Sequence, residues 1–165
     1  MDSSDDVVSA IESAFAGVPR GRVTLHEAEA MDRRLSIEET KAARKRDPES
    51  DWRDVPAASI EECRAALCFV DADSWRFYLP AYMRLGLRHL EAPRNLAIDV
   101  AIYSLDCGAG PPEAVERNME RFRGLRPDQA AAVRRFLTFA SQNEELCDAY
   151  VARQALDSYW AATGG

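Results

Sequence analysis

The sequence predicts an all-α protein: a single domain of residues 1–165, built from about eight short helices packed as a bundle or an orthogonal array. Apolar residues recur at helical spacing along most of the chain. A Ser or Thr followed three residues later by Glu, the capping box that starts many helices, also recurs. Breaks that contain Gly or Pro separate these segments at short intervals, and the chain length suits one domain.

The first helix is expected directly after Ser3 or Ser4, because apolar residues from Val7 onward follow the helical period until Pro19. Three capping boxes follow, and each predicts a helix that begins just after its hydroxyl residue. The pairs are Thr24 with Glu27, Ser36 with Glu39 and Ser59 with Glu62, and the predicted helices cover residues 25–33, 37–46 and 60–69. The second of these segments ends in four basic residues, Lys41, Arg44, Lys45 and Arg46. They suit a solvent-facing helix end better than a nucleic-acid patch, since no aromatic side chains interleave with them.

Pro80 sets the expected start of the next helix. Proline is tolerated in the first turn of a helix and disrupts its interior. We therefore expect this helix to begin at Pro80 or one residue before it and to end near Leu90. Residues 71–74 then form a turn, and 75–78 form an extended lead-in.

Four more helices are predicted in the remaining chain. In the first, apolar residues at 98, 100 and 102 also alternate as in a strand, but the segment length and a capping Asn95 favour a helix. The other signals are a Gly- and Pro-rich break at 108–112 before the helical segment 115–122, Pro127 at the start of the next segment, and Ser141 with Glu144 at the start of the last.

The net charge of −7 and the pI near 4.9 bear on partners. An acidic chain is poorly suited to a phosphate backbone, so no nucleic-acid partner is expected. The longest apolar runs fall far short of the ~20 residues of a membrane span, so no membrane partner is expected either. The four cysteines form no C-x-x-C motif, and the acidic start at 2–6 is unlike a basic secretory leader. Free thiols and a cytoplasmic location are therefore expected.

Patterns of catalytic and metal-binding residues are missing from the sequence. The two histidines, His26 and His89, lie outside H-E-x-x-H and E-x-x-H spacing, so neither a metal nor another cofactor is expected. Asp71 and Asp73 resemble half of a calcium loop whose other ligand positions are wrong, and bonds to nearby backbone amides are the preferred interpretation. Because G-x-S-x-G, P-loop and G-x-G-x-x-G motifs are also lacking, a non-enzyme is favoured, although a Cys–His pair that meets only in space stays open.

Six of the fourteen aromatic residues lie between Trp52 and Tyr82. We interpret this segment chiefly as core, because aromatic side chains bury large areas and usually serve packing. The alternative is a groove for a partner or ligand, in which Asp71, Arg76, Tyr78 and Tyr82 are the candidate binding residues. Tyr and Arg are frequent among residues that dominate binding energy.

The run Phe77–Met83 reads F-Y-L-P-A-Y-M. With it, the chain resembles an uncharacterised bacterial family, a domain of unknown function marked by this signature. The other segments that carry the resemblance are 11–18, 27–32, 52–56, 67–71, Arg76 and 129–139. The resemblance covers most of the chain; it implies a bacterial cytoplasmic origin and brings no activity, substrate or catalytic residue.

These patterns leave the biochemical function undetermined between two hypotheses. The leading one is a non-enzymatic, acidic protein-binding module of adaptor or immunity type, which covers a basic protein partner. The alternative is an enzyme or a small-ligand-binding protein with a site beside Tyr78 and Tyr82. A pocket with converging polar groups near these tyrosines would favour the alternative, and a solid aromatic core would favour the binding module. The oligomeric state is left open.

Overall fold

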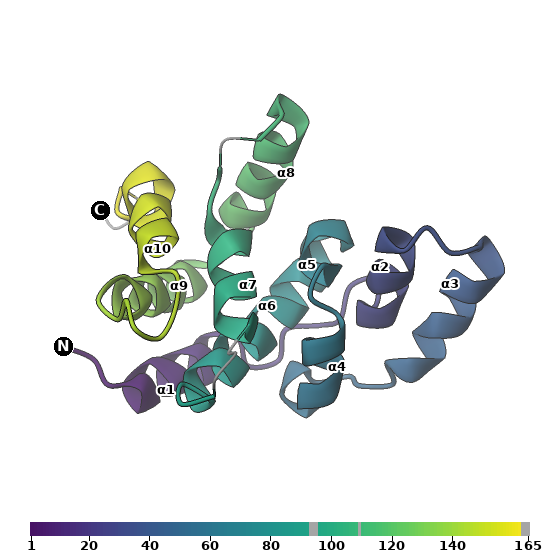
Figure 1. Cartoon of the computed structure of the whole chain (residues 1–165), viewed down its shortest axis with the longest axis horizontal. Helices are drawn as coiled ribbons and strands as arrows, with labels where there is room; N and C mark the ends of the chain where they lie inside the picture. The colour runs from purple at the N-terminus through teal and green to yellow at the C-terminus, as the bar shows by residue number, and fades with distance from the viewer. Residues whose placement is uncertain (93–95, 109, 163–165) are drawn as a thin grey trace.

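The computed structural model of the chain describes residues 1–92, 96–108 and 110–162. Within these residues every regular element is a helix, so the all-α prediction is confirmed. Ten α-helices are described, and three short 3₁₀ or π turns accompany them (Figure 1).

The N-terminal helices begin at the capping residues that the sequence indicates. They are α1 (Ser4–Ala14), α2 (Leu25–Asp32), α3 (Ile37–Ala43) and the 3₁₀ turn η1 (Arg44–Arg46) that continues α3. Ser3 caps α1. The Thr24 N–H donates a hydrogen bond to the Glu27 carboxylate (2.8 Å), and the Ser36 hydroxyl accepts one from the Glu39 N–H (3.2 Å). Each cap satisfies a backbone group that a helix end otherwise leaves unpaired, which fixes where the helix starts.

Trp52 anchors the loop between α3 and the following helices. It begins a 3₁₀ turn, η2 (Trp52–Asp54), and its side chain is buried, as predicted. The indole N–H donates a hydrogen bond to the carbonyl of Phe15 at the end of α1 (2.9 Å), and the Arg84 guanidinium lies 4.9 Å from the ring centre. The loop is therefore attached to the core through one large side chain.

The helix predicted over 60–69 is wrong in its start and its continuity. Two shorter helices replace it, α4 (Ala57–Glu62) and α5 (Ala66–Phe69). Pro56 takes the N-cap position of α4, so Ser59 lies inside the helix and caps nothing. At Cys63 the backbone leaves the helical region, and its carbonyl accepts a hydrogen bond from the buried Tyr82 hydroxyl. A contact from a distant segment thus accompanies the break that local sequence does not show.

The prediction that a helix begins at or next to Pro80 is also wrong. The helix α6 (Ala72–Arg88) starts eight residues earlier, and the expected lead-in at 75–78 is helical. Asp71 is the N-cap: one carboxylate oxygen accepts hydrogen bonds from the backbone N–H groups of Asp73 (3.2 Å) and Ser74 (3.1 Å). The turn at Asp71 is therefore real, and it is the turn that starts the helix.

Pro80 lies in the interior of α6, where proline removes one backbone hydrogen bond and crowds the preceding turn at a cost of about 3 kcal/mol. Apolar side chains on both sides of it are fully buried, among them Trp75, Phe77, Leu79 and Met83. Burying each of these contributes about 1.5–3 kcal/mol, so the packed helix more than offsets the proline.

The next three helices agree with the sequence. They are α7 (Leu96–Leu105), α8 (Pro112–Arg123) and α9 (Pro127–Ser141). The helical interpretation of 98–102 is confirmed, and Pro127 occupies the first turn of its helix. The predicted cap at Asn95 lies outside the described residues.

The start predicted for the last helix is wrong. Ser141 is the final residue of α9, where its hydroxyl donates to the carbonyl of Thr138 (2.8 Å), and Glu144 pairs with Arg153 (2.8 Å). Asp148 caps the last helix instead by accepting a hydrogen bond from a backbone N–H of the first turn. The elements are α10 (Ala149–Ala155) and the π-helical turn η3 (Leu156–Trp160).

The helix α6 runs through the centre of the molecule and packs against α7 and α1 (Figure 1). On one side α9 packs against α1 and α10; on the other, α2 packs against α5 and α3. Buried residues from all of these helices except α3 join one hydrophobic cluster. Among the described residues, no helix has the length and apolarity needed to cross a membrane.

Candidate functional site

The two tyrosines predicted as binding residues belong to the core. Tyr78 is 1% exposed and Tyr82 is fully buried. The Tyr78 oxygen accepts a hydrogen bond from the backbone N–H of Leu25 (3.2 Å), and the Tyr82 hydroxyl donates to the carbonyl of Cys63. The interpretation of the aromatic segment as core is confirmed for five of its six aromatic residues; the exception is Phe69, which is 43% exposed. Both tyrosine hydroxyls hold neighbouring segments against α6.

Asp71 and Arg76 lie near the start of α6 and point to other partners. Beyond its capping bonds, the Asp71 carboxylate accepts a hydrogen bond from the backbone N–H of Val23 (2.9 Å). Arg76 has an ion pair with the exposed Asp73 (3.5 Å). In the described part of the chain, no hydrogen bond or ion pair joins any two of the four predicted side chains. They do not form one groove in this structure.

Because these two tyrosines are buried, the stability of the fold is expected to depend on pH in the alkaline range. Desolvation raises the pKa of both Tyr78 and Tyr82 above the ordinary value near 10. Because the pKa is higher in the folded state, the associated stability is complete below about pH 10 and is lost as the pH rises above it. Urea titrations at pH ~9 and ~11 should show a fall in the free energy of unfolding that is smaller in Tyr78→Phe. An equal fall in the variant, or phenolate absorbance from Tyr78 in the folded protein, would contradict this.

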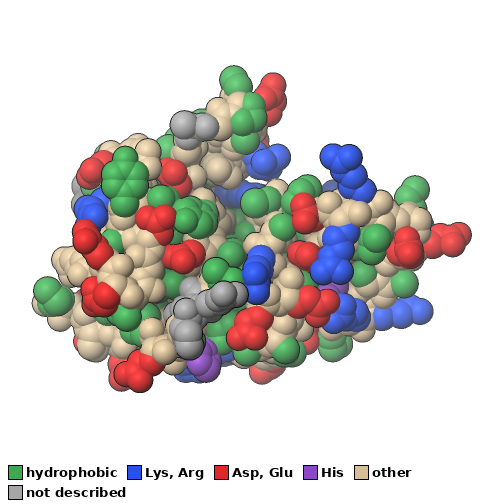
Figure 2. All heavy atoms as spheres, in the orientation of Figure 1, with side chains coloured by type: hydrophobic (Ala, Val, Ile, Leu, Met, Phe, Trp, Pro, Cys, Tyr) green, Lys and Arg blue, Asp and Glu red, His purple; other side chains and the backbone are tan. Residues whose placement is uncertain are grey.

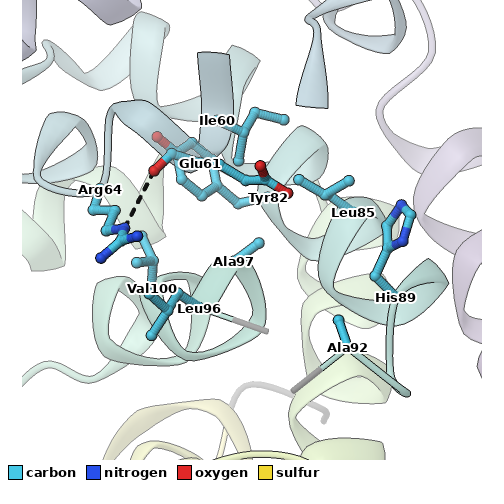
Figure 3. A pocket seen from close by; sticks show the side chains of 10 residues that line it. All are labelled: Ile60, Glu61, Arg64, Tyr82, Leu85, His89, Ala92, Leu96, Ala97 and Val100. Carbon is cyan, nitrogen blue, oxygen red and sulfur yellow. Dashed lines mark hydrogen bonds between the residues drawn. The ribbon is translucent and has the colours of Figure 1, made fainter. Parts of the chain in front are cut away.

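A hollow of about 240 Å³ lies beside the Tyr82 ring (Figure 3). Arg64 stands at one end, where its Nε donates to the carbonyl of Glu61 (3.2 Å), and His89 stands at the other. Glu61 also lines it, and the other lining side chains are apolar: Ile60, Leu85, Ala92, Leu96, Ala97 and Val100. Because the Tyr82 hydroxyl is already bonded to the carbonyl of Cys63, the hollow suits binding better than proton transfer through this tyrosine.

His26 and Asp47 form a buried pair that sequence spacing does not reveal. Both side chains are 3% exposed, and the His26 Nδ1 lies 2.5 Å from the Asp47 carboxylate. The other ring nitrogen lies 3.6 Å from Glu62, which in turn pairs with Arg46 (2.7 Å). A His oriented by an Asp is a catalytic arrangement only when the free ring nitrogen faces substrate. Here that nitrogen is buried, so the pair fastens the segment after η1 to α2.

The thiol nearest this polar cluster is not set up as a nucleophile. Cys63 is buried, and desolvation, followed by the charge of Glu29, raises its pKa to about 12. A thiol with such a pKa stays protonated at neutral pH, whereas nucleophilic cysteines have lowered values. The Cys–His pair left open by the sequence therefore gains no support here. In the described residues, His, Cys, Asp and Glu form no group of three able to hold a metal ion.

Exposed tyrosines and carboxylates occur on α7 and on the segment of α10 and η3, and α7 packs against α10. We call Tyr103, Asp148, Tyr150 and Asp157 the tyrosine–carboxylate face. Tyr103 is 53% and Tyr150 is 69% exposed, unusually high for large side chains in this protein. The Tyr103 hydroxyl donates to the Asp148 carboxylate (2.8 Å), which raises the pKa of Tyr103 to about 12. Tyr150 and Asp157 line a shallow depression along α10 and η3, together with Arg153, Gln154 and Ser158.

The surroundings of this face are acidic. Asp99 lies next to it and accepts a hydrogen bond from the backbone N–H of Asp148 (2.8 Å). The nearby Arg153 is paired with Glu144. Figure 2 shows carboxylates gathered over the α9 and α10 side of the molecule, whereas Lys and Arg gather over α2 and α3. The sequence did not single out Tyr103 and Tyr150, because only the packing of the helices shows that these two large aromatic side chains are exposed.

Comparison with known proteins places the chain in a family. A family model described as a family of unknown function (DUF6714) matches residues 3–164, almost the whole chain. No curated protein and no solved structure matches the chain.

Proposed function

The chain belongs to DUF6714, a family of unknown function, and we propose that it is a non-enzymatic binding module, of adaptor or immunity type, for a basic protein partner. The observation that carries the proposal is the pair of exposed tyrosines set among carboxylates on the tyrosine–carboxylate face. Tyrosine is enriched among residues that dominate binding energy. The net charge of −7 adds attraction for a basic partner at longer range.

The face suits Lys and Arg side chains of a partner. A cation lying over a tyrosine ring gains electrostatic attraction, and a neighbouring carboxylate adds an ion pair. Asp148 is held in place by Tyr103 and by its capping bond, so it is oriented before a partner arrives. Preorganised charges of this kind favour fast and selective association.

Bacterial origin and a cytoplasmic location form part of the same proposal. The F-Y-L-P-A-Y-M run supports the origin only through the resemblance described above. As binding residues, Asp71, Arg76, Tyr78 and Tyr82 remain a prediction; their burial and bonds support a role in shaping α6 more than direct contact.

Tyr150→Ala is expected to abolish capture of a basic protein by the immobilised chain. Wild type and variant would be exposed to the same native extract at low and high salt, and retained proteins would be identified by mass spectrometry. Ile37→Ala is the matched control, because Ile37 is 75% exposed on α3, far from α10 (Figure 1). The proposal fails if wild type retains no basic protein at low salt, or if Tyr150→Ala and Ile37→Ala retain it equally well.

The second candidate function is binding of a small ligand in the hollow beside Tyr82, where Glu61, Arg64 and His89 supply polar groups around an apolar lining. This hollow is smaller than most ligand sites, which span roughly 300–1,000 Å³. Of the two tyrosines, Tyr82 lines it and Tyr78 does not. The exposed tyrosines therefore support the binding module more strongly.

A further inference from the structure

A second hollow, of about 340 Å³, lies between α5, α7 and α8. It adjoins the hollow beside Tyr82, because Arg64 and Val100 line both. In Figure 2 the surface is hollowed beside α8, with Lys or Arg side chains at the edge. Three arginines line it, Arg64, Arg117 and Arg121, and no described carboxylate does. The protein as a whole carries more Asp and Glu than Lys and Arg, which makes this local excess of positive charge informative.

Arg121 is a buried guanidinium with incomplete partners. It is 4% exposed; one terminal nitrogen donates to the carbonyl of Val70 (2.5 Å), and the group lies 6.0 Å from the Trp75 ring centre. Its Nε is buried without a hydrogen bond, and no ion pair to it occurs in the described residues. Desolvation, followed by repulsion from Arg117, lowers the pKa of Arg121 to about 10. Buried charges in proteins are normally paired, so this one lacks an expected counter-charge.

Arg117 adds a second positive charge on the same side of α8, and it has no ion pair within the part of the chain that the structure describes. It precedes Arg121 by four residues, a spacing that places like charges together on a helix and destabilises it. Asp71 attracts Arg121 from a distance, but the Asp71 oxygens are bonded to Val23 and Ser74. By contrast, Arg123 on the same helix is paired with Glu116 (3.4 Å).

Apart from the polar side chains of Ser104 and Asn118, the rest of the hollow is apolar. Leu67 and Cys68 come from α5, Val100 and the Tyr103 ring from α7, and Ala114 from α8. Its volume is in the range of small-molecule sites, where an apolar lining with a few charged groups is the usual composition. A ligand that fits it needs a negative head and an apolar body.

We propose that this hollow binds a small organic anion, whose carboxylate or phosphate lies between Arg117 and Arg121 and whose apolar part lies against Leu67 and Val100. Guanidinium groups bind both head groups through paired, charge-assisted hydrogen bonds. The anion would also supply the missing counter-charge of Arg121. This inference does not depend on the proposed protein partner, although Tyr103 borders both surfaces.

Calorimetry with octanoate, octyl phosphate and octanol tests the proposal. Both anions are expected to bind, and octanol at least tenfold more weakly. Arg117→Gln should raise the Kd of the tighter anion at least tenfold; Arg117 is exposed, so the variant should fold. Arg123→Gln, the same charge change on the same helix outside the hollow, should alter the Kd by less than twofold. Comparison of the two anions identifies the preferred head group.

Alkylation of Cys68 by iodoacetamide provides a second readout at the hollow itself. Cys68 is an exposed thiol that lines it, whereas the half-buried Cys107 lies outside it. The tighter anion should slow the labelling of Cys68 at least threefold and leave that of Cys107 unchanged, as measured by mass spectrometry. The proposal is overturned if neither anion binds more tightly than octanol, if Arg123→Gln weakens binding as much as Arg117→Gln, or if Cys68 is not protected.

Discussion

Replacing Phe77 with Ala is expected to lower the free energy of unfolding by ~3–5 kcal/mol. Phe77 is fully buried near the middle of α6, and its ring meets the Tyr78 ring edge-on with centres 4.9 Å apart. Truncation removes apolar area from the core and leaves a cavity, because the close-packed surroundings relax only partly. The loss is a large share of the ~5–15 kcal/mol typical of a whole domain.

Urea titration of the variant measures this loss. Phe69→Ala is the matched control, because Phe69 is 43% exposed at the end of α5 and should lose less than half as much. Near-neutral behaviour of Phe77→Ala would mean that the segment is exposed in solution, and α6 would then be a binding surface.

Elements with local end signals were predictable from the sequence. Ser3, Thr24 and Ser36 start α1, α2 and α3 through bonds within three residues, and Pro127 starts α9. Such signals depend on neighbouring residues alone, so they can be recognised before any tertiary contact is known.

The helix boundaries predicted from the sequence were wrong where contacts between distant segments determine the backbone conformation. Because proline normally avoids helix interiors, the sequence predicted that a helix starts at Pro80. In the structure, buried apolar side chains before and after Pro80 stabilise the longer helix α6. The break at Cys63 lies where its carbonyl meets the hydroxyl of Tyr82, nineteen residues away. Neither outcome has a signature in the local sequence.

The candidate binding residues show the same contrast between what residue types indicate and what contacts between distant segments determine. Tyr78 and Tyr82 were selected for their residue types, and only the packing of α2 and α4 against α6 shows that their hydroxyls are occupied. The four-residue spacing of Arg117 and Arg121 is visible in the sequence as an unfavourable pair of like charges. The hollow that they share with Arg64 exists only once α5, α7 and α8 converge.

Asp47→Ala is expected to cost ~3–5 kcal/mol of stability at neutral pH, as is usual when one partner of a buried pair is removed. The Asp47 carboxylate accepts two hydrogen bonds from His26, one from the backbone N–H (2.8 Å) and one from the ring Nδ1 (2.5 Å), which carries a proton because it faces a carboxylate. Truncation leaves both donors buried and without an acceptor, and it also releases the segment after η1 from α2.

The double variant His26→Leu/Asp47→Ala separates the pairing from the packing. Leucine has no ring donor to leave unsatisfied, so the double variant should be more stable than Asp47→Ala alone by about 1 kcal/mol or more, a non-additive result typical of residues in contact. Urea titrations of the wild type, Asp47→Ala, His26→Leu and the double variant complete the cycle from which additivity is judged. If Asp47→Ala costs under ~1 kcal/mol, or if the two substitutions are simply additive, water reaches the pair and it does not fasten the segment after η1 to α2.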